Sequence, residues 1–299
     1  MAELKKIIVG HDLRAGGETA LRSAAVLARR CSAELRLVHV IEPQHTYQRI
    51  SHPLTCPYTL EEIAQKNGAK LQALAASPEF AHLQVEYEVR TGKPFVELII
   101  ARRAWQADLI VVGPASQGAH FLGSTSERVV RKAMVPVMVA KKTLSGNAKT
   151  FLVPTDFSDC ARQAAQEALV LAESFHGRII FLHVVDVYPL YTVGYADEFG
   201  VSVPLPPPSP DVIEREWQGF LSHLPIEKVK WENYTEEGES ATAILQKAEE
   251  KQADLIVMGT HGRTGLEYML LGSVAEKVVR RAHCPVLTIR PEAFQFEMP

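Results

Sequence analysis

Cysteine is scarce in this chain and is not arranged for cross-linking or for metal binding. The four cysteines, Cys31, Cys56, Cys160 and Cys284, stand far apart and form no C-x-x-C pair. Neither a disulfide framework nor a cysteine zinc site is therefore expected. Free, scattered cysteines are typical of proteins in a reducing compartment such as the cytosol.

The sequence also lacks long apolar runs and a strong charge of one sign. No apolar run approaches the ~18 residues that a membrane helix requires. A strand is expected at Ile7–Val9, directly after Met1–Lys6, which leaves no room for a signal peptide. With 32 Lys and Arg against 35 Asp and Glu, the net charge is −3, so nucleic acid is not expected as the main partner. We expect a cytoplasmic protein that contacts neither membrane nor nucleic acid.

Known catalytic motifs are missing as well. The sequence contains no H-E-x-x-H, no G-x-S-x-G and no paired metal ligands. We therefore expect no dedicated catalytic residues and no metal held by protein side chains.

What the sequence does contain is an internal repeat, which predicts the same module twice. Four pairs of segments match in the same order: Lys6–Asp12 with Thr150–Asp156, Leu37–Ile41 with Phe181–Val185, Gln106–Gly113 with Gln252–Gly259, and Glu127–Val137 with Glu276–Val286. A chain of 299 residues has the length for two domains of roughly 100–200 residues each. We place the domains at residues 1–144 and 145–299, with a polar linker at 141–149 as the seam.

Within each copy, apolar strands alternate with helical segments, which is typical of a parallel sheet with crossover helices. The expected strands are 5–9, 34–41, 83–90, 108–112 and 136–140 in the first copy, and 150–154, 178–186, 228–235, 254–258 and 285–290 in the second. Small residues such as Ala24 and Ala168 form a stripe on the first helix of each copy. Such a stripe suits close packing on a sheet.

The second copy carries a glycine-rich loop between a buried strand and a helix. Gly259, Gly262 and Gly272 separate the apolar run Ala253–Met258 from the helical segment Ala275–Arg281. Glycine lets backbone N–H groups approach a ligand closely, and a helix start offers unpaired N–H groups and a positive dipole end. The loop therefore has the requirements for holding phosphate, although it is neither a Walker A loop nor a G-x-G-x-x-G motif.

Helix initiation offers a simpler explanation for part of this pattern. Ser273 and Glu276 form an S-x-x-E capping box, which would explain both residues without a ligand. The nucleotide hypothesis therefore depends mainly on Gly259, Gly262 and the length of the loop.

The spacing G-x2-G-x9-G-S, which ends at Gly272-Ser273, resembles the signature of ATP-binding members of the universal stress protein family. The resemblance covers nearly the whole chain as two tandem domains. It implies an α/β fold with two doubly wound, five-stranded parallel sheets of the adenine nucleotide alpha hydrolase-like, universal stress protein type. In doubly wound sheets the ligand binds beyond the carboxyl ends of the strands, where the strand order reverses.

The resemblance implies a role for each matched residue. Asp156 would contact the ribose or the base, Val184 and Met258 would enclose the adenine, and Arg263 would add charge at the outer phosphates. The expected ATP site, with Mg2+ bound through the nucleotide, consists of Pro154, Thr155, Asp156, Val184, Met258, Gly259, Gly262, Arg263, Gly272, Ser273 and Val274. A turn or N-cap role for Asp156 and a solvated loop role for Arg263 are the alternatives.

The first copy departs from this pattern. Its loop is three residues shorter, has Ser116 in place of the second glycine, and contains Pro114, which removes a backbone donor. Ser124 and Glu127 keep the capping-box spacing. We expect the first copy to bind ATP weakly or not at all, and the second copy to keep the site.

Three histidines lie at positions where either a structural or a functional role is conceivable. His39 and His183 recur at equivalent strand positions, which favours a repeated packing role over catalysis. His261 lies inside the glycine-rich loop, where it could face a base or a phosphate or could simply support the loop.

Three functions are compatible with the sequence. The first is an ATP-binding stress-response or signalling module whose occupancy alters the surface offered to an unknown protein partner, with slow ATP hydrolysis as its only enzymatic activity. The second is an interaction protein that binds no nucleotide and has a vestigial loop. The third is an adenylate-transferring enzyme whose substrate pocket would come from the insertion Tyr188–Pro210. The resemblance also implies that the last strands, Val135–Val139 and Pro285–Ile289, pair within the chain, and it leaves a homodimer open.

Overall fold

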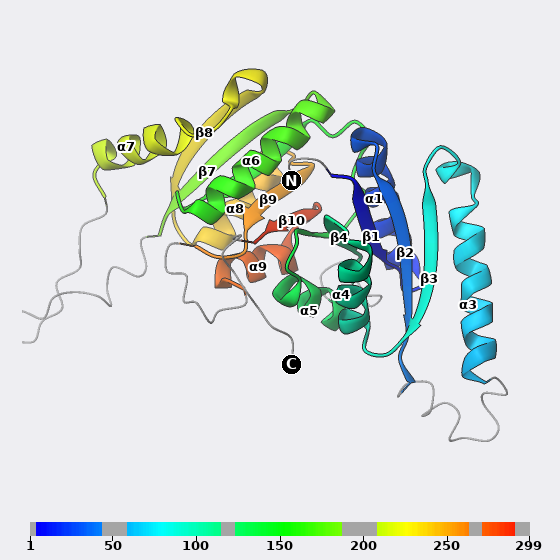
Figure 1. Cartoon of the computed structure of the whole chain (residues 1–299). Coiled ribbons are helices and arrows are strands. Elements are labelled where there is room, and N and C mark those ends of the chain that lie inside the picture. Colours follow the sequence, from blue (N-terminus) through cyan, green and yellow to red (C-terminus); the bar gives the residue numbers. More distant parts are fainter. Residues whose placement is uncertain (1–3, 44–58, 115–122, 187–207, 263–270, 291–299) are drawn as a thin grey trace, which may run out of the picture. The chain divides into compact units, whose positions relative to one another are not determined.

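The computed structural model describes residues 4–43, 59–114, 123–186, 208–262 and 271–290 (Figure 1). The chain forms two compact units, with main bodies Met1–Asn147 and Ala148–Ala282. Of the insertions that the sequence singles out, 43–58 and 188–210, almost all residues lie outside this description.

The first unit is a parallel sheet with crossover helices. Its strands are β1 (Lys6–Gly10), β2 (Glu34–Ile41), β3 (Val85–Thr91), β4 (Leu109–Val112) and β5 (Val137–Val139). Its helices are α1 (Ala15–Cys31), α3 (Leu60–Ala75), α4 (Pro94–Trp105) and α5 (Ser124–Lys132). Across the sheet the strands run in the order β3-β2-β1-β4-β5. The chain therefore winds toward one edge from β1 to β3 and toward the other edge from β4 to β5, which is the doubly wound arrangement.

The second unit repeats this plan. The strands of the second copy are β6 (Thr150–Thr155), β7 (Arg178–Val185), β8 (Lys230–Glu237), β9 (Leu255–Gly259) and β10 (Val286–Ile289). Its helices are α6 (Asp159–Phe175), α7 (Pro210–Leu221), α8 (Ser240–Glu250) and α9 (Ser273–Arg281). Strand β6 lies between β7 and β9, and both pairs are parallel. Strand β10 follows β9 in the order.

The predicted fold class is confirmed, and every expected strand is found with its ends within two residues of the prediction. The central strands β4 and β9 are apolar because helices cover both faces of a parallel sheet. Ala24 and Ala168 are both 0% exposed. Their missing bulk lets α1 and α6 lie close to the sheet.

A turn after the first strand is built in the same way in both units. Leu13 and Phe157 have φ values of 58° and 64°, a region that few residues other than glycine adopt. In each turn the amide of that residue donates to the side chain two positions earlier, His11 Nδ1 at 3.0 Å and Thr155 Oγ1 at 2.9 Å. The turn fixes the position of the aspartate that precedes the strained residue.

His39 and His183 each form a hydrogen bond with the backbone of one of these turns. Nδ1 of His39 donates to the carbonyl of His11 at 2.8 Å, and Nδ1 of His183 donates to the carbonyl of Thr155 at 2.9 Å. Burial lowers the pKa of His39. The same structural hydrogen bond therefore explains why a histidine occurs at both positions.

The expected capping boxes are wrong. Helices α5 and α9 begin at Ser124 and Ser273, and their N-caps are the preceding glycines, Gly123 and Gly272, without a side-chain cap bond. Each serine therefore stands one position too late to accept the bond of a capping box. Glu276 instead pairs with Arg280 at 2.9 Å, so helix capping does not explain Ser273.

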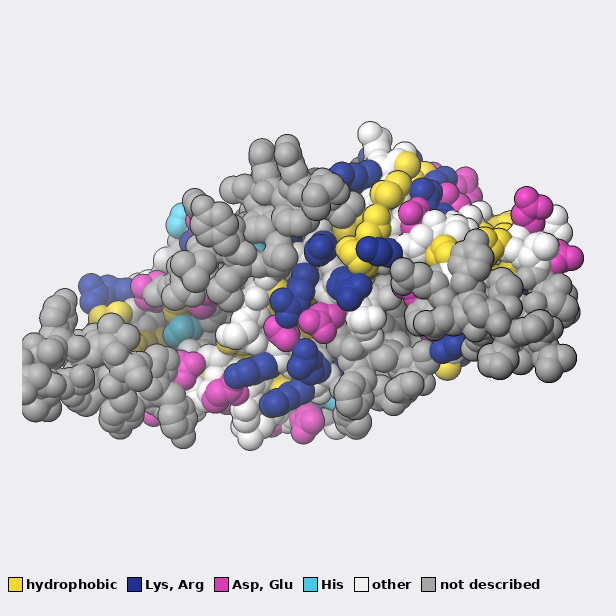
Figure 2. Space-filling model, turned by 90° about the horizontal axis from the view of Figure 1, so that it is seen from below, with side chains coloured by type: hydrophobic (Ala, Val, Ile, Leu, Met, Phe, Trp, Pro, Cys, Tyr) yellow, Lys and Arg dark blue, Asp and Glu magenta, His cyan; other side chains and the backbone are white. Residues whose placement is uncertain are grey.

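Basic residues lie in the last turn of several helices, including α5 and α9. The last turn of α5 carries Arg131 and Lys132, and that of α9 carries Arg280 and Arg281, where cations face the negative end of the helix dipole. Figure 2 shows Lys and Arg side chains gathered on the face that is seen from below. Within the described ranges, no helix combines the length and the apolar character that crossing a membrane would require.

Candidate functional site

A cavity of about 310 Å3 lies at the carboxyl ends of β6, β7 and β9 in the second unit. This is the edge at which a doubly wound sheet binds its ligands. The cavity is lined by Pro154, Thr155, Asp156, Ala161, Leu182, Val184, Ser240, Ile244, Met258, Gly259, Thr260, His261, Gly262, Gly272, Ser273, Val274 and Ala275. Ten of the eleven residues expected at the ATP site line it, and the eleventh, Arg263, lies outside the described residues.

One wall of the cavity is apolar. Met258 comes from β9 and Leu182 from β7, the strands on either side of β6, and they are 5% and 0% exposed. Val184 and Ile244 extend this wall. Such a surface suits a flat apolar ring system, because ligand pockets are mostly apolar with a few placed polar groups.

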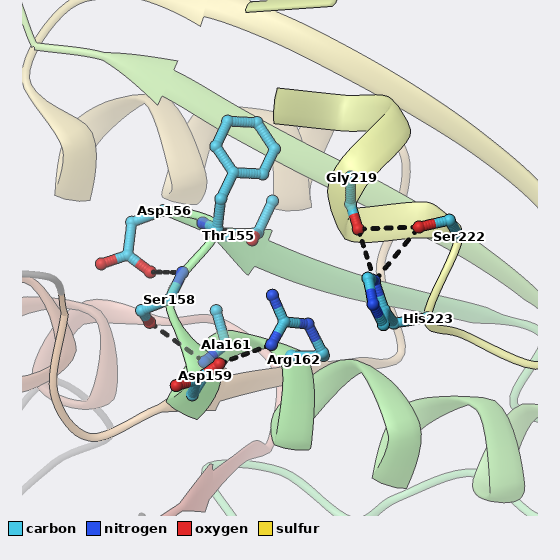
Figure 3. Close-up of polar contacts among 10 residues, drawn as sticks. Thr155, Asp156, Ser158, Asp159, Ala161, Arg162, Gly219, Ser222 and His223 are labelled. Atoms are coloured by element: carbon cyan, nitrogen blue, oxygen red, sulfur yellow. Dashed lines mark hydrogen bonds and ion pairs between the residues drawn. The ribbon is translucent and has the colours of Figure 1, made fainter. Parts of the chain in front are cut away.

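Asp156 supplies a carboxylate at the end of β6. Its Oδ1 accepts a hydrogen bond from the amide of Ser158 at 3.1 Å, which closes the turn before α6 (Figure 3). The N-cap of α6 is Ser158, whose hydroxyl accepts from the amide of Ala161 at 3.2 Å. Asp156 is therefore a turn residue rather than the cap, and it makes this contact through Oδ1.

The other oxygen of Asp156 faces the glycine-rich loop. A Cβ placed on Gly262 would come within 2.5 Å of Asp156 Oδ2, closer than real Cβ contacts allow. Gly262 therefore keeps open the space beside this carboxylate. A side chain at this position would push into the cavity or displace Asp156.

The other two glycines of the motif are required by packing. A Cβ on Gly259 would lie 2.7 Å from the thiol of Cys160, and one on Gly272 would lie 3.1 Å from the carbonyl of Thr260. The amide of Gly272 also donates to that carbonyl at 2.7 Å. Gly272 thus serves to set the start of α9, and its amide is not directed to a ligand here.

The first turn of α9 opens on the cavity. Ser273, Val274 and Ala275 all line it, and the first amides of a helix have no partner within the helix. They carry the positive end of the helix dipole. The amides of Ser273 and Val274, with the Ser273 hydroxyl, are therefore the groups best placed to hold an anion.

Sequence reasoning missed part of the lining. Ser240 and Ile244 belong to α8, so the helix after the third strand also reaches the cavity. A signal for this was present: Gly92 and Gly238 recur after the third strand of each copy, and both have positive φ, 151° and 143°. His261 lines the cavity as well, and its Nδ1 lies 2.8 Å from the hydroxyl of Thr260.

The equivalent place in the first unit is built differently. Gly16 stands where the second unit has Cys160, and a Cβ on Gly113 would overlap the backbone of Gly16. A Cβ on Gly16 would lie 2.7 Å from the carbonyl of Pro114. Asp12 Oδ1 accepts from the amide of Gly17 at 3.0 Å. Backbone therefore packs on backbone at the end of β4, while Ser116 and Gly118 lie outside the described residues.

Together these features define a class of protein: two consecutive doubly wound α/β domains, of which the second has a ligand-sized cavity at the carboxyl edge of its sheet. The model of the universal stress protein family matches residues 3–141 and again residues 147–290. The chain belongs to the universal stress protein family and contains two such domains.

Individual relatives agree with this. A universal stress protein of Methanocaldococcus jannaschii is 40% identical over 146 residues, which cover 48% of this chain and 82% of that protein. One of Mycolicibacterium smegmatis is 30% identical over 299 residues, covering 95% of this chain and 97% of that protein. A crystal structure of a universal stress protein from Archaeoglobus fulgidus DSM 4304 covers 95% of this chain and 98% of its own, with TM-score 0.68 and 22% identity.

Proposed function

We propose that the second domain binds ATP in the cavity at the ends of β6, β7 and β9, and that occupancy alters the surface that the protein offers to a partner in the cytoplasm. One observation supports this above the others. Residues expected at an ATP site from four separate segments, around Asp156, Val184, Gly259 and Ser273, line a single cavity. That convergence involves segments far apart in the sequence.

The chemistry of the lining fits each part of the nucleotide. The apolar wall with Val184 and Met258 suits adenine, Asp156 Oδ2 suits a ribose hydroxyl, and the first amides of α9 suit phosphate. Among the described residues there is no group of three or more His, Cys, Asp or Glu that could hold a metal. Mg2+ would therefore be bound through the phosphates.

Slow ATP hydrolysis can accompany this binding, since a bound triphosphate with Mg2+ needs only a positioned water. Asp156 and His261 are the titratable residues in the described lining. Oδ1 of Asp156 is engaged in its turn, and Nδ1 of His261 is within hydrogen-bond distance of Thr260. We assign neither of them as a catalytic base.

A second candidate function is an interaction protein without a nucleotide. Packing contacts explain Gly259 and Gly272 without any ligand, and the Gly272 amide is engaged with Thr260. This alternative predicts a stable fold that ATP does not affect.

Calorimetric titration of the purified chain with ATP and Mg2+ separates the two candidates. We expect one ATP per chain and a rise in melting temperature with ATP concentration, because a ligand that binds only the native state stabilises it by mass action. If millimolar ATP gave no binding heat and no change in melting temperature, the result would favour the interaction protein.

The family resemblance leads to two further proposals about assembly. We propose a domain boundary between residues 144 and 145, and pairing of the strand segments Val135–Val139 and Pro285–Ile289 within one chain. Limited proteolysis should cut first in the linker 141–149. Light scattering would then report whether two chains also form a homodimer.

A further inference from the structure

Successive residues of one turn in the second unit line two different hollows. Asp156 lines the cavity described above, whereas Phe157 lines a groove of about 500 Å3 between the start of α6 and α7. The groove is bordered by Phe157, Arg162, Val212, Arg215, Glu216, Gly219, Phe220 and His223. Its volume lies within the range of pockets that hold small molecules, roughly 300–1,000 Å3.

The floor of this α7 groove is aromatic and fixed. Phe157 and Phe220 are 8% and 1% exposed, and their ring centroids lie 5.8 Å apart. Trp217 holds Phe157 from the side with an edge-on contact at 5.0 Å. Val212, at the rim, is 37% exposed. An aromatic ligand would therefore meet the exposed Val212 and the small accessible part of Phe157, above a buried and fixed layer of rings.

The wall of the groove is mainly cationic. Arg162 and Arg215 contribute guanidinium groups, His223 an imidazole, and Glu216 the one carboxylate among the lining residues. Figure 3 shows Arg162 on α6 and His223 in the turn that directly follows α7. A guanidinium binds carboxylate, sulfonate or phosphate oxygens by charge-assisted hydrogen bonds.

Donor capacity remains on both arginines. Arg162 Nη1 pairs with Asp159, while its buried Nε makes no hydrogen bond within the described part of the chain. Arg215 Nε donates to the carbonyl of Asp211 at 3.2 Å, which uses one of the five N–H donors of a guanidinium. Arg215 is exposed, so an acidic ligand can reach its remaining donors, with the charge of Arg162 in the same groove.

The first unit does not share these features. Arg162 is the fourth residue of α6, and the fourth residue of α1 is Glu18, so the charge is reversed. The strained turn carries Leu13 in place of Phe157. The combination of an aromatic floor and a cationic wall is thus specific to the unit that carries the nucleotide cavity.

We infer that the α7 groove is a second ligand site, which binds a small organic anion that joins an acidic group to an aromatic ring. The ring packs against Val212 and the accessible part of Phe157, and the acidic group is held by Arg162 and Arg215. The site goes beyond nucleotide binding and does not depend on it.

A pair of fluorescent probes tests this site. Anilinonaphthalene sulfonate is an aromatic anion, and N-phenylnaphthylamine is its uncharged counterpart. The full-length protein should bind the sulfonate saturably, with one site per chain. The double variant R162Q/R215Q should bind it ~10-fold more weakly, as the loss of a charge-assisted contact implies, and should bind the neutral probe unchanged. The exposed Arg22 of the first unit, changed to Gln, is the matched control.

A steric variant provides a second, independent test. A Cβ on Gly219 would meet nothing within 4 Å, so Gly219→Leu fills the groove while favouring the helix. It should abolish binding of both probes without lowering the melting temperature. Gly68→Leu, at a helical glycine of α3 whose Cβ would make only an ordinary contact of 3.9 Å with Val89, should leave both unchanged.

The location of the probe decides between this groove and the nucleotide cavity. Excess ATP should not displace the sulfonate, and Gly262→Asp should still bind it. Displacement by ATP, full binding by Gly219→Leu, equal losses in the Arg22→Gln control, or no saturable binding would each overturn the inference.

Discussion

Gly262 allows the most direct residue-scale test of the nucleotide cavity. Its missing side chain leaves the space beside Asp156 Oδ2 open. In Gly262→Asp, the new side chain occupies that space and places a second negative charge where phosphates approach. We expect ATP binding at least ~10-fold weaker, a loss of about 1.4 kcal/mol, with little change in melting temperature because Gly262 is exposed. Calorimetric titration measures the dissociation constant of ATP for the wild type and for Gly262→Asp.

Two glycine-to-aspartate controls accompany this variant. Gly146 lies in the linker, and a Cβ there would meet nothing within 4 Å. Gly118 is the glycine of the first-copy loop that lies nearest in sequence to Ser116, the position that matches Gly262. Gly146→Asp and Gly118→Asp should both bind ATP as the wild type does. A loss with Gly118→Asp equal to that with Gly262→Asp would mean that the first domain takes part in binding.

At the scale of elements, Glu239 connects the two helices whose first turns line the cavity. It is the N-cap of α8, where its Oε2 accepts from the amide of Thr242 at 2.8 Å. Its Oε1 pairs with Lys277 of α9 at 2.8 Å. The hydrogen bond from Lys277, then that from Thr242, lowers the pKa of Glu239 from 4.5 to about 2.

Glu239→Gln should therefore lower stability in a pH-dependent manner. Glutamine keeps one acceptor oxygen for the cap but loses the charge that faces the N-terminus of α8 and pairs with Lys277. A loss of about 1 kcal/mol corresponds to a melting temperature lower by about 2–4 °C at neutral pH. Because the folded-state pKa is depressed, the contribution of Glu239 is complete above pH 4.5 and is lost as the pH falls toward about 2. Melting curves of both proteins should converge over that interval.

Glu237, exposed at the end of β8, is the control for charge alone. Glu237→Gln should melt within a degree of the wild type at every pH. A gap between wild type and Glu239→Gln that stayed constant down to pH 2 would show that the ionised carboxylate is not what connects the helices.

Whole elements could be predicted from the sequence, because their signals are local and repeated. The apolar run before Gly259 and the matched run before Gly113 are periodic and long enough to fix a strand in each copy. The site required contacts between distant segments, and there the sequence was less informative. The recurring Gly92 and Gly238 mark the turn before α8, but nothing in the sequence shows that Ser240 reaches the cavity. The capping box expected at Ser273 is wrong because spacing alone cannot distinguish the first helical residue from the residue before it. Arg162 and Phe220 gave no signal, since their proximity depends on how α7 packs.

At the scale of the whole molecule, duplication gave two domains of one fold and different local chemistry. In the first, backbone packs on backbone at Gly16 and Gly113. In the second, the side chain of Cys160 fills the corresponding contact with Gly259, and burial raises the pKa of that thiol. The fold accommodates both contacts, so the site of one domain can differ in sequence while the other domain keeps its own.

This division predicts where ATP should act in the intact chain. A ligand that binds only the native state suppresses local opening around its site, and at 100 times its dissociation constant it adds about 2.7 kcal/mol. Hydrogen exchange measured by mass spectrometry should therefore slow in peptides from 254–262 and 271–282 when ATP is added. The matched peptides 108–114 and 123–132 of the first domain are the internal control, and their exchange should not change. Equal protection of both sets would place nucleotide in both domains, and protection of neither would leave the interaction protein as the function of this chain.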